Sequence, residues 1–155
     1  MVNEKGIIKE YDLVVYPPHY VVAIGDVEKE INSMYIPYDK DYNWISFPKS
    51  TSVDGGTYTI RNKKTNISSV MVWFKSLDDF NPETVTHECD HAALEIFSYT
   101  GAKVHFDNQE PYCYLAGNMA RLAYQAYSEY NDYLAKNKKK KKNGKATKDK
   151  QASNS

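Results

Sequence analysis

The chain has few cysteines, no long apolar run and, before its last 20 residues, few positive charges. Two cysteines in 155 residues exclude a disulfide-rich scaffold, and in the cytoplasmic location that we expect from the N-terminal sequence, Cys89 and Cys113 should be reduced thiols. No apolar run approaches the ~20 residues that a membrane-spanning helix needs. The first ten residues are polar and lack the apolar region of a signal peptide. We therefore expect a cytoplasmic protein with no membrane partner.

Charge is strongly segregated, although 20 Lys and Arg residues balance 20 Asp and Glu residues overall. Residues 136–155 hold nine Lys and one Asp, whereas residues 1–135 hold 11 basic and 19 acidic residues. A nucleic-acid-binding domain would need a basic face on its folded part. We therefore expect no nucleic-acid partner except through the Lys-rich tail. The low complexity of 136–155 predicts disorder, which leaves one folded domain over 1–135.

The first half of the chain favours short strands. Extended segments are expected at residues 7–16, 20–24, 44–47, 57–61 and 69–74. The polar turn at 62–66 favours a hairpin between the two strands beside it. Asp26 is expected to cap a short helix that ends near Met34.

Two long helices are expected to follow the strands. Asn81, Pro82 and Glu83 form a helix-start pattern, and Gly101 is a stop signal after about residue 99. Asp107 or Asn108 would cap the second helix, which should fade near residue 135. Its buried stripe is expected to comprise Leu115, Met119, Leu122, Ala126 and Tyr130. Strands followed by helices predict an α+β fold.

The segment His87-Glu88-Cys89-Asp90-His91 matches the pattern H-E-x-x-H and falls inside the first long helix. Residues four apart differ by about 40° around a helix axis, so both imidazoles point the same way and can share one ion. Glu88 lies about 100° from His87, where a carboxylate can take a proton from a metal-bound water. The simpler interpretation is two histidines and an ordinary carboxylate on an amphipathic helix.

A catalytic zinc ion usually has three protein ligands, so a third is needed. Glu110, which opens the second helix, is the preferred candidate, with His105 and Asp107 as alternatives. Glu110 could instead be a first-turn acid favoured by the helix dipole. Glu95 follows His91 by one turn and is expected to hold an imidazole N–H rather than the ion.

The series His87, Glu88, His91 and Glu110 gives H-E-x2-H-x18-E, which resembles the gluzincin metallopeptidases, notably their aminopeptidase branch. A similar two-helix pattern occurs in small phage-encoded proteins classed as metallopeptidases. The resemblance covers residues 82–122. It implies a minimal zincin-like domain in which His87, His91 and Glu110 bind zinc and Glu88 is the general base. The substrate motif Gly-Ala-Met-Glu-Asn is absent from the sequence, so the substrate class does not carry over.

Other residues near this pattern have two interpretations each. Tyr112 or Tyr114 could donate a hydrogen bond to an oxyanion, although core packing is the simpler role. On the second helix, Gly117 could allow close helix packing, and Arg121 could pair with Glu95 or Asp90. Cys89 lies about 160° from His91 around the helix, so both thiols are expected to be small core residues rather than ligands.

The resulting hypothesis is zinc-dependent hydrolysis of a peptide or protein substrate. The segment Ser69–Phe74 is expected to be an edge strand that aligns an extended peptide. The alternative is a zinc-stabilised protein without catalytic activity, which acts by binding or belongs to a virion. Glu88→Gln distinguishes them, because it should abolish hydrolysis while zinc stays bound.

Overall fold

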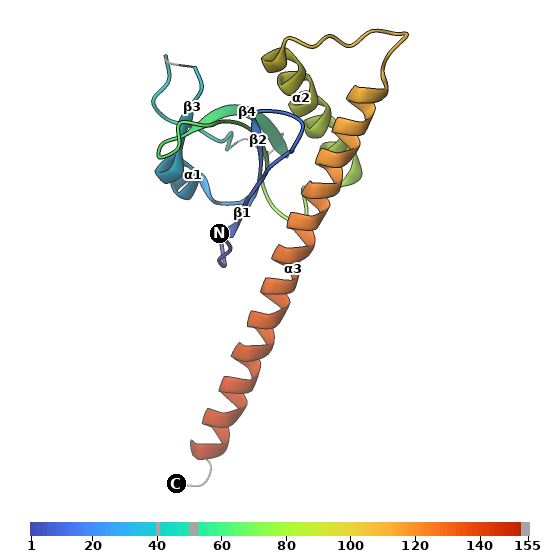
Figure 1. Cartoon of the computed structure of the whole chain (residues 1–155). Coiled ribbons are helices and arrows are strands. Elements are labelled where there is room, and N and C mark those ends of the chain that lie inside the picture. Colours follow the sequence, from blue (N-terminus) through green and yellow to red (C-terminus); the bar gives the residue numbers. More distant parts are fainter. Residues whose placement is uncertain (40, 50–52, 153–155) are drawn as a thin grey trace.

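The computed structural model describes residues 1–39, 41–49 and 53–152, with side chains up to residue 140. Five strands form one mixed sheet with the order β1-β2-β5-β4-β3. Their bounds are β1 Gly6–Tyr11, β2 His19–Gly25, β3 Tyr35–Pro37, β4 Gly55–Asn62 and β5 Ser68–Phe74. Only β2 and β5 run parallel, while the other neighbouring pairs are antiparallel. The predicted α+β class is confirmed (Figure 1).

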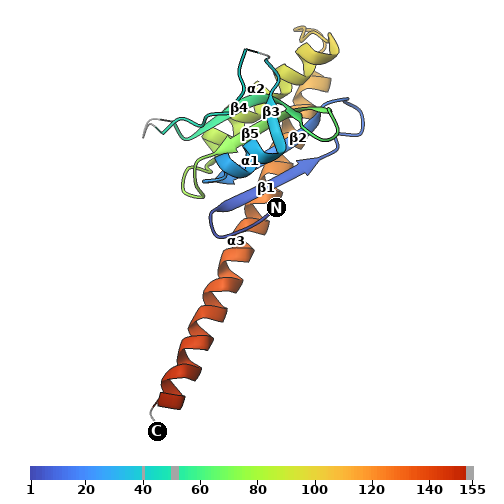
Figure 2. The same cartoon turned by 90° about the vertical axis from the view of Figure 1, so that its left-hand side faces the viewer.

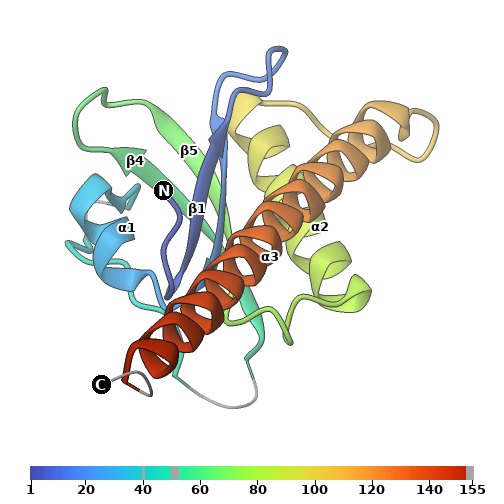
Figure 3. The same cartoon turned by 90° about the horizontal axis from the view of Figure 1, so that it is seen from below.

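Three helices complete the described fold. They are α1 Glu28–Met34, α2 Pro82–Thr100 and α3 Glu110–Ala152. Figure 2 shows α1 on one side of the sheet and α2 and α3 on the other, and Figure 3 shows α3 running obliquely across α2. No helix in the described part of the chain is both long and apolar enough to span a bilayer.

The sheet separates two hydrophobic clusters because alternate strand residues point to opposite faces. On the α2–α3 face, the strands contribute Val22, Val70 and Phe74 to a cluster that includes Ile96 and Met119. The α1 face carries a smaller cluster, whose members include Val21, Ile31, Phe47, Ile60, Met71 and Trp73. Residues Thr57 and Thr59 of β4 pair with Val72 and Val70 of β5, so their side chains point to the α2 face.

The predicted bounds of α2 are confirmed. The Asn81 side chain accepts a hydrogen bond from the Thr84 backbone N–H at 3.0 Å, which satisfies one free donor at the helix start. Gly101 ends the helix with a left-handed φ of 71°, a conformation that glycine adopts without steric cost. Local signals alone therefore fix the helix that carries the H-E-x-x-H pattern.

The predicted buried stripe of α3 is also confirmed, but the helix is longer than expected. All five stripe residues predicted above are buried. The helix continues past residue 135 to Ala152, through the segment predicted to be disordered. Lys and Ala are good helix formers and no proline interrupts this segment, which is compatible with a continued helix. In Figure 1 this part of α3 projects beyond the sheet.

Three strand predictions need correction. The first strand ends at Tyr11, not at residue 16, because Val14 adopts a positive φ of 62° that breaks extended structure. Residues 44–47 form no strand and pack beside α1 instead. The segment Ser69–Phe74 is the centre of the sheet, between β2 and β4, and not an edge. The hairpin around 62–66 is confirmed by the antiparallel β4–β5 register.

The predicted cap of the short helix is also wrong. The residue that caps α1 is Val27, and no side chain bonds to the helix start there.

Candidate functional site

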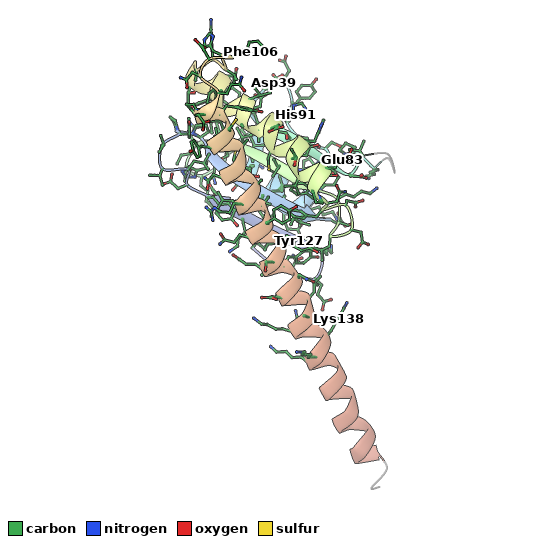
Figure 4. All side chains as sticks on the ribbon, turned by 90° about the vertical axis from the view of Figure 1, so that its right-hand side faces the viewer. Asp39, Glu83, His91, Phe106, Tyr127 and Lys138 are labelled. Carbon is green, nitrogen blue, oxygen red and sulfur yellow. The ribbon has the colours of Figure 1, made fainter. Side chains whose placement is uncertain are left out.

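The exposed face of α2 brings His87 and His91 together as the sequence predicts. Their Nε2 atoms lie 3.2 Å apart, and their rings are nearly perpendicular at 81° with centroids 4.6 Å apart. Both side chains are exposed to solvent. Figure 4 labels His91 on α2, between the labels of Asp39 and Glu83.

The separation between the two Nε2 atoms is compatible with shared coordination of one metal ion. Two nitrogen ligands at about 2.0–2.1 Å from a tetrahedral zinc ion would be roughly 3.4 Å apart. The observed 3.2 Å is close to this value, and it also suits a hydrogen bond from the N–H of one ring to the other. The two rings therefore have the separation that two ligands of one metal ion require. Without a metal, a hydrogen bond between the rings accounts for the same distance.

Glu88 lies on the inner side of α2 and is buried, with 7% of its surface exposed. Its Oε2 accepts a hydrogen bond of 2.8 Å from the Thr57 hydroxyl of β4, which also approaches the Glu88 backbone carbonyl at 3.0 Å. A buried carboxylate needs such donors, because burial without them is costly. Thr57 thus fixes the orientation of the carboxylate beside the imidazole pair.

Gly55 allows β4 to lie close enough to α2 for this contact. A Cβ atom at position 55 would come within 2.9 Å of the Trp73 carbonyl oxygen and 3.2 Å of the Glu88 Cγ atom. The Thr84 side chain lies equally near. Any larger residue at position 55 would push the strand away from the helix that carries the candidate base.

The His87–His91 pair and Glu88 line one open cavity, which we name the histidine groove. Its volume is about 330 Å³, and its lining residues are Thr57, Thr59, His87, Glu88, His91 and Glu95. A second cavity of about 450 Å³ continues past the helix start and shares His87 and Glu88. Glu95 also lines the groove, but its Oε2 accepts from the Thr59 hydroxyl at 3.4 Å, and among the described residues it does not make the expected hydrogen bond to an imidazole.

Glu110 does not join the two histidines. In the part of the chain that the structure describes, no group of three His, Cys, Asp or Glu side chains is placed to hold a metal ion. This also leaves the alternatives His105 and Asp107 without a ligand role. The reason lies in the rotation of α3, because at about 100° per residue Glu110 is roughly 150° from the centre of the buried stripe. Its side chain is therefore exposed on the far side of α3.

Other residues on the exposed face of α3 do not make the contacts expected from the sequence. Tyr114 is three-quarters exposed, and a Cβ atom at Gly117 would meet no atom within 4 Å, so neither residue brings the helices together. The Arg121 guanidinium donates to the Asn118 side chain at 2.9 Å rather than pairing with Glu95 or Asp90.

Tyr112 takes the packing role considered above. Its ring lies edge-on to Phe97, and its hydroxyl donates to the Asp90 backbone carbonyl at 3.3 Å. Partial burial, with the nearby Asp90, raises the pKa of its phenol. The hydroxyl therefore ties α3 to α2 behind the histidines.

The two thiols differ in environment. Cys89 is buried and lies 3.5 Å from the Tyr20 hydroxyl, which confirms its predicted place in the core. Burial raises the pKa of Cys89 to about 11. Cys113 is exposed, so its predicted core role is wrong.

Three residues of the site were not predicted from the sequence, Thr57, Thr59 and Gly55, all on β4. Their signal was the alternation of Gly55, Thr57 and Thr59, which puts small or polar residues on one face of a strand whose neighbour is strongly apolar. The alternation shows that this face meets something polar, but it does not identify α2 as the partner.

Comparisons with known proteins give no relative for this chain: no family model, no curated protein and no solved structure matches it.

Proposed function

We propose that this protein hydrolyses peptide bonds with the help of a zinc ion that His87 and His91 bind, and that Glu88 is the general base. The observation that carries the proposal is the placement of the imidazole pair and a buried, oriented carboxylate in the same groove. An ordinary surface histidine pair would not need a buried carboxylate beside it.

A zinc ion supplies two things at such a site, a lower pKa for a bound water and polarisation of a carbonyl group. The protein groups do the remaining work. Because Thr57 holds Oε2 of Glu88, the second carboxylate oxygen is left to accept a proton from water and deliver it to the leaving amine. The exposed rings of His87 and His91 leave the groove open to a large substrate.

The proposal rests on two protein ligands, because Glu110 is on the wrong face of α3. With two ligands instead of the usual three, we expect weaker zinc binding than a complete catalytic site provides. Purification in chelating buffers should therefore yield metal-free protein that regains activity when zinc is added.

An extended peptide could be aligned by β4 rather than by the segment predicted from the sequence. The edge strand β3 pairs only with Ile60–Asn62, and the Tyr38 backbone N–H donates to the Thr59 carbonyl at 3.0 Å, so the described residues place no strand beside Gly55–Tyr58. The Asp54 carbonyl accepts a hydrogen bond from the Lys75 backbone N–H, on the side of β5. Hydrogen-bonded positions alternate along an antiparallel pair, so the backbone N–H and C=O groups of Gly55 and Thr57 point away from β5. Those groups lie alongside the histidine groove and suit pairing with a substrate backbone.

The test combines metal analysis and hydrolysis in wild type and three variants. In calorimetric titration with zinc, which keeps free metal at equilibrium with the protein, we expect about one binding site in wild type and Glu88→Gln, and a large loss of affinity in His91→Ala. His105→Ala is the matched control, since His105 is an exposed histidine outside the groove, and it should keep the metal. Glu88→Gln should lower hydrolysis of a mixed fluorogenic peptide library by about 10²–10⁴-fold.

The absence of a third ligand among the described residues favours one rival, a zinc-binding protein without turnover. In that case wild type would bind zinc but cleave no peptide of the library. Wild-type protein that binds no more zinc than His91→Ala would exclude both functions.

A further inference from the structure

Another cavity adjoins β4, and it has aromatic walls. Its volume is about 510 Å³, within the range of ligand-binding pockets. Four aromatic side chains line it, Tyr38, Tyr42, Trp44 and Tyr58, of which the first three are about half exposed or more. Such exposure of large rings around one concave surface is typical of a binding site. We name it the aromatic cavity.

The wall that Trp44 contributes is anchored to α1. The Trp44 indole N–H donates to the Glu28 carboxylate at 3.2 Å, and the Phe47 backbone N–H donates to the same carboxylate at 2.9 Å. Asn32 bonds both the N–H and the carbonyl of Ile45. These bonds hold residues 44–47 in place, so the cavity is built into the fold.

The floor is anchored in the same way. The Tyr58 ring packs against Phe47, with ring centroids 5.5 Å apart, and Phe47 stacks on Trp73 at 4.4 Å. Trp73 is buried in the core of the α1 face. The aromatic floor of the cavity is therefore continuous with the hydrophobic core.

The aromatic cavity and the histidine groove meet at β4. Thr57 and Thr59 line both, while the intervening Tyr58 points to the opposite face. Successive side chains of a peptide paired with this edge would alternate in the same way. If one residue lies over His87 and Glu88, its neighbour is directed into the aromatic cavity.

The Asp, Glu, Lys and Arg residues that line both cavities in the described part of the chain are all acidic. Among the described lining residues of these cavities and their two neighbours there are carboxylates but no Lys or Arg. The carboxylates are Asp39, Asp54, Glu83, Glu88 and Glu95. Asp39 lines the aromatic cavity itself. Aromatic faces beside a carboxylate attract a cation, through the ring quadrupole and the opposite charge.

We infer that the aromatic cavity binds a Lys or Arg side chain of an extended peptide, in the residue next to the one held over the histidine groove. This inference rests on the proposed function for its substrate, a peptide lying along β4. A long side chain with an apolar stem and a cationic end matches a cavity with ring walls and an acid at its side.

The test measures binding separately from turnover. Full-length Glu88→Gln protein, with zinc present, is titrated with dye-labelled blocked pentapeptides that differ only at the central residue, Lys, Arg, Gln, Leu or Glu, and anisotropy gives each Kd. We expect Lys and Arg peptides to bind about tenfold more tightly than the Gln peptide, and the Glu peptide most weakly. Asp39→Asn and Trp44→Leu, each added to this protein, should remove most of that preference.

Asp78→Asn is the matched control, because Asp78 is an exposed acid outside these cavities and its loss changes the net charge equally. Preference retained in Asp39→Asn, or lost equally in Asp78→Asn, would overturn the inference, as would tighter binding of the Leu peptide. A Lys preference in Glu88→Gln protein with no cleavage by wild type would uphold the inference and defeat the proposed function. Cleavage by wild type without a preference would do the reverse.

Discussion

Replacing Thr57 by Val removes the hydroxyl that holds Glu88 and changes little else. Val matches Thr in shape and is equally suited to a strand, so packing and strand preference are preserved. The lost bond is 2.8 Å long and ends on a carboxylate that is 7% exposed. A hydrogen bond to a charged group contributes about 1.5–3 kcal/mol, and a buried acceptor left without its donor carries that full cost.

We therefore expect Thr57→Val to lower the free energy of unfolding by about 2 kcal/mol at pH 7. For a domain of this size the corresponding fall in Tm is about 4–8 °C. Urea unfolding followed by tryptophan fluorescence measures the change, since the buried Trp73 reports loss of the core. Thr57→Ser keeps the hydroxyl and should recover most of the loss.

Thr59→Val is the matched control, two residues along the same strand face. Its hydroxyl lies 3.4 Å from the exposed Glu95 carboxylate, a weak contact in solvent, so the expected cost is below about 0.5 kcal/mol. Equal effects of Thr57→Val and Thr59→Val would refute the idea that Thr57 supports Glu88. The same conclusion would follow if Thr57→Val cost as much in a Glu88→Leu background as in wild type, because the cycle would show no coupling.

Three further predictions concern the helix start, the thiols and the tyrosines. Asn81→Ala should lower the free energy of unfolding by about 1 kcal/mol in urea titrations, because it removes the cap of α2, and Asn81→Asp should be nearly neutral. Iodoacetamide at pH 8 should modify one thiol per native chain, Cys113, because burial raises the pKa of Cys89 to about 11; two modified thiols by mass spectrometry would contradict this. Above about pH 10 the protein should lose stability, because burial raises the pKa of several phenols in the folded state and the unfolded chain releases its protons first. The phenols concerned are Tyr11 and Tyr58, at about 12, with Tyr20 and Tyr35 raised further. A urea midpoint unchanged between pH 9 and pH 11 would contradict that prediction.

Much of the local structure follows from the sequence. The bounds of α2, its cap at Asn81 and its stop at Gly101 depend on residues within a few positions of each other. The same is true of the convergence of His87 and His91, since residues four apart always share a helix face. The predicted strands agree with the structure where apolar residues alternate or run together. They disagree at the turn that contains Val14, where a positive φ ends β1.

The error at Glu110 has a physical explanation that the sequence already contains. The buried stripe of α3, from Leu115 to Tyr130, and the Glu110 face are on opposite sides of one rigid rod. Burying the stripe stabilises the fold through many apolar contacts, whereas one carboxylate ligand cannot rotate the helix against them. The number of residues between two motifs shows whether the loop is long enough to bring them together. The rotation of the second helix about its axis decides whether its side chain points to the site.

The sequence was sufficient to predict the α+β order of elements, the buried stripe of α3 and the imidazole pair, because these depend on periodicity and on neighbours along the chain. Tertiary structure alone decided that Ser68–Phe74 lies at the centre of the sheet, that Thr57 bonds to Glu88 from 31 positions away, and that an aromatic cavity adjoins the histidine groove. These features depend on which strand faces pack together across long stretches of chain. That choice is made by the burial of the whole core, so no local pattern of residues encodes it.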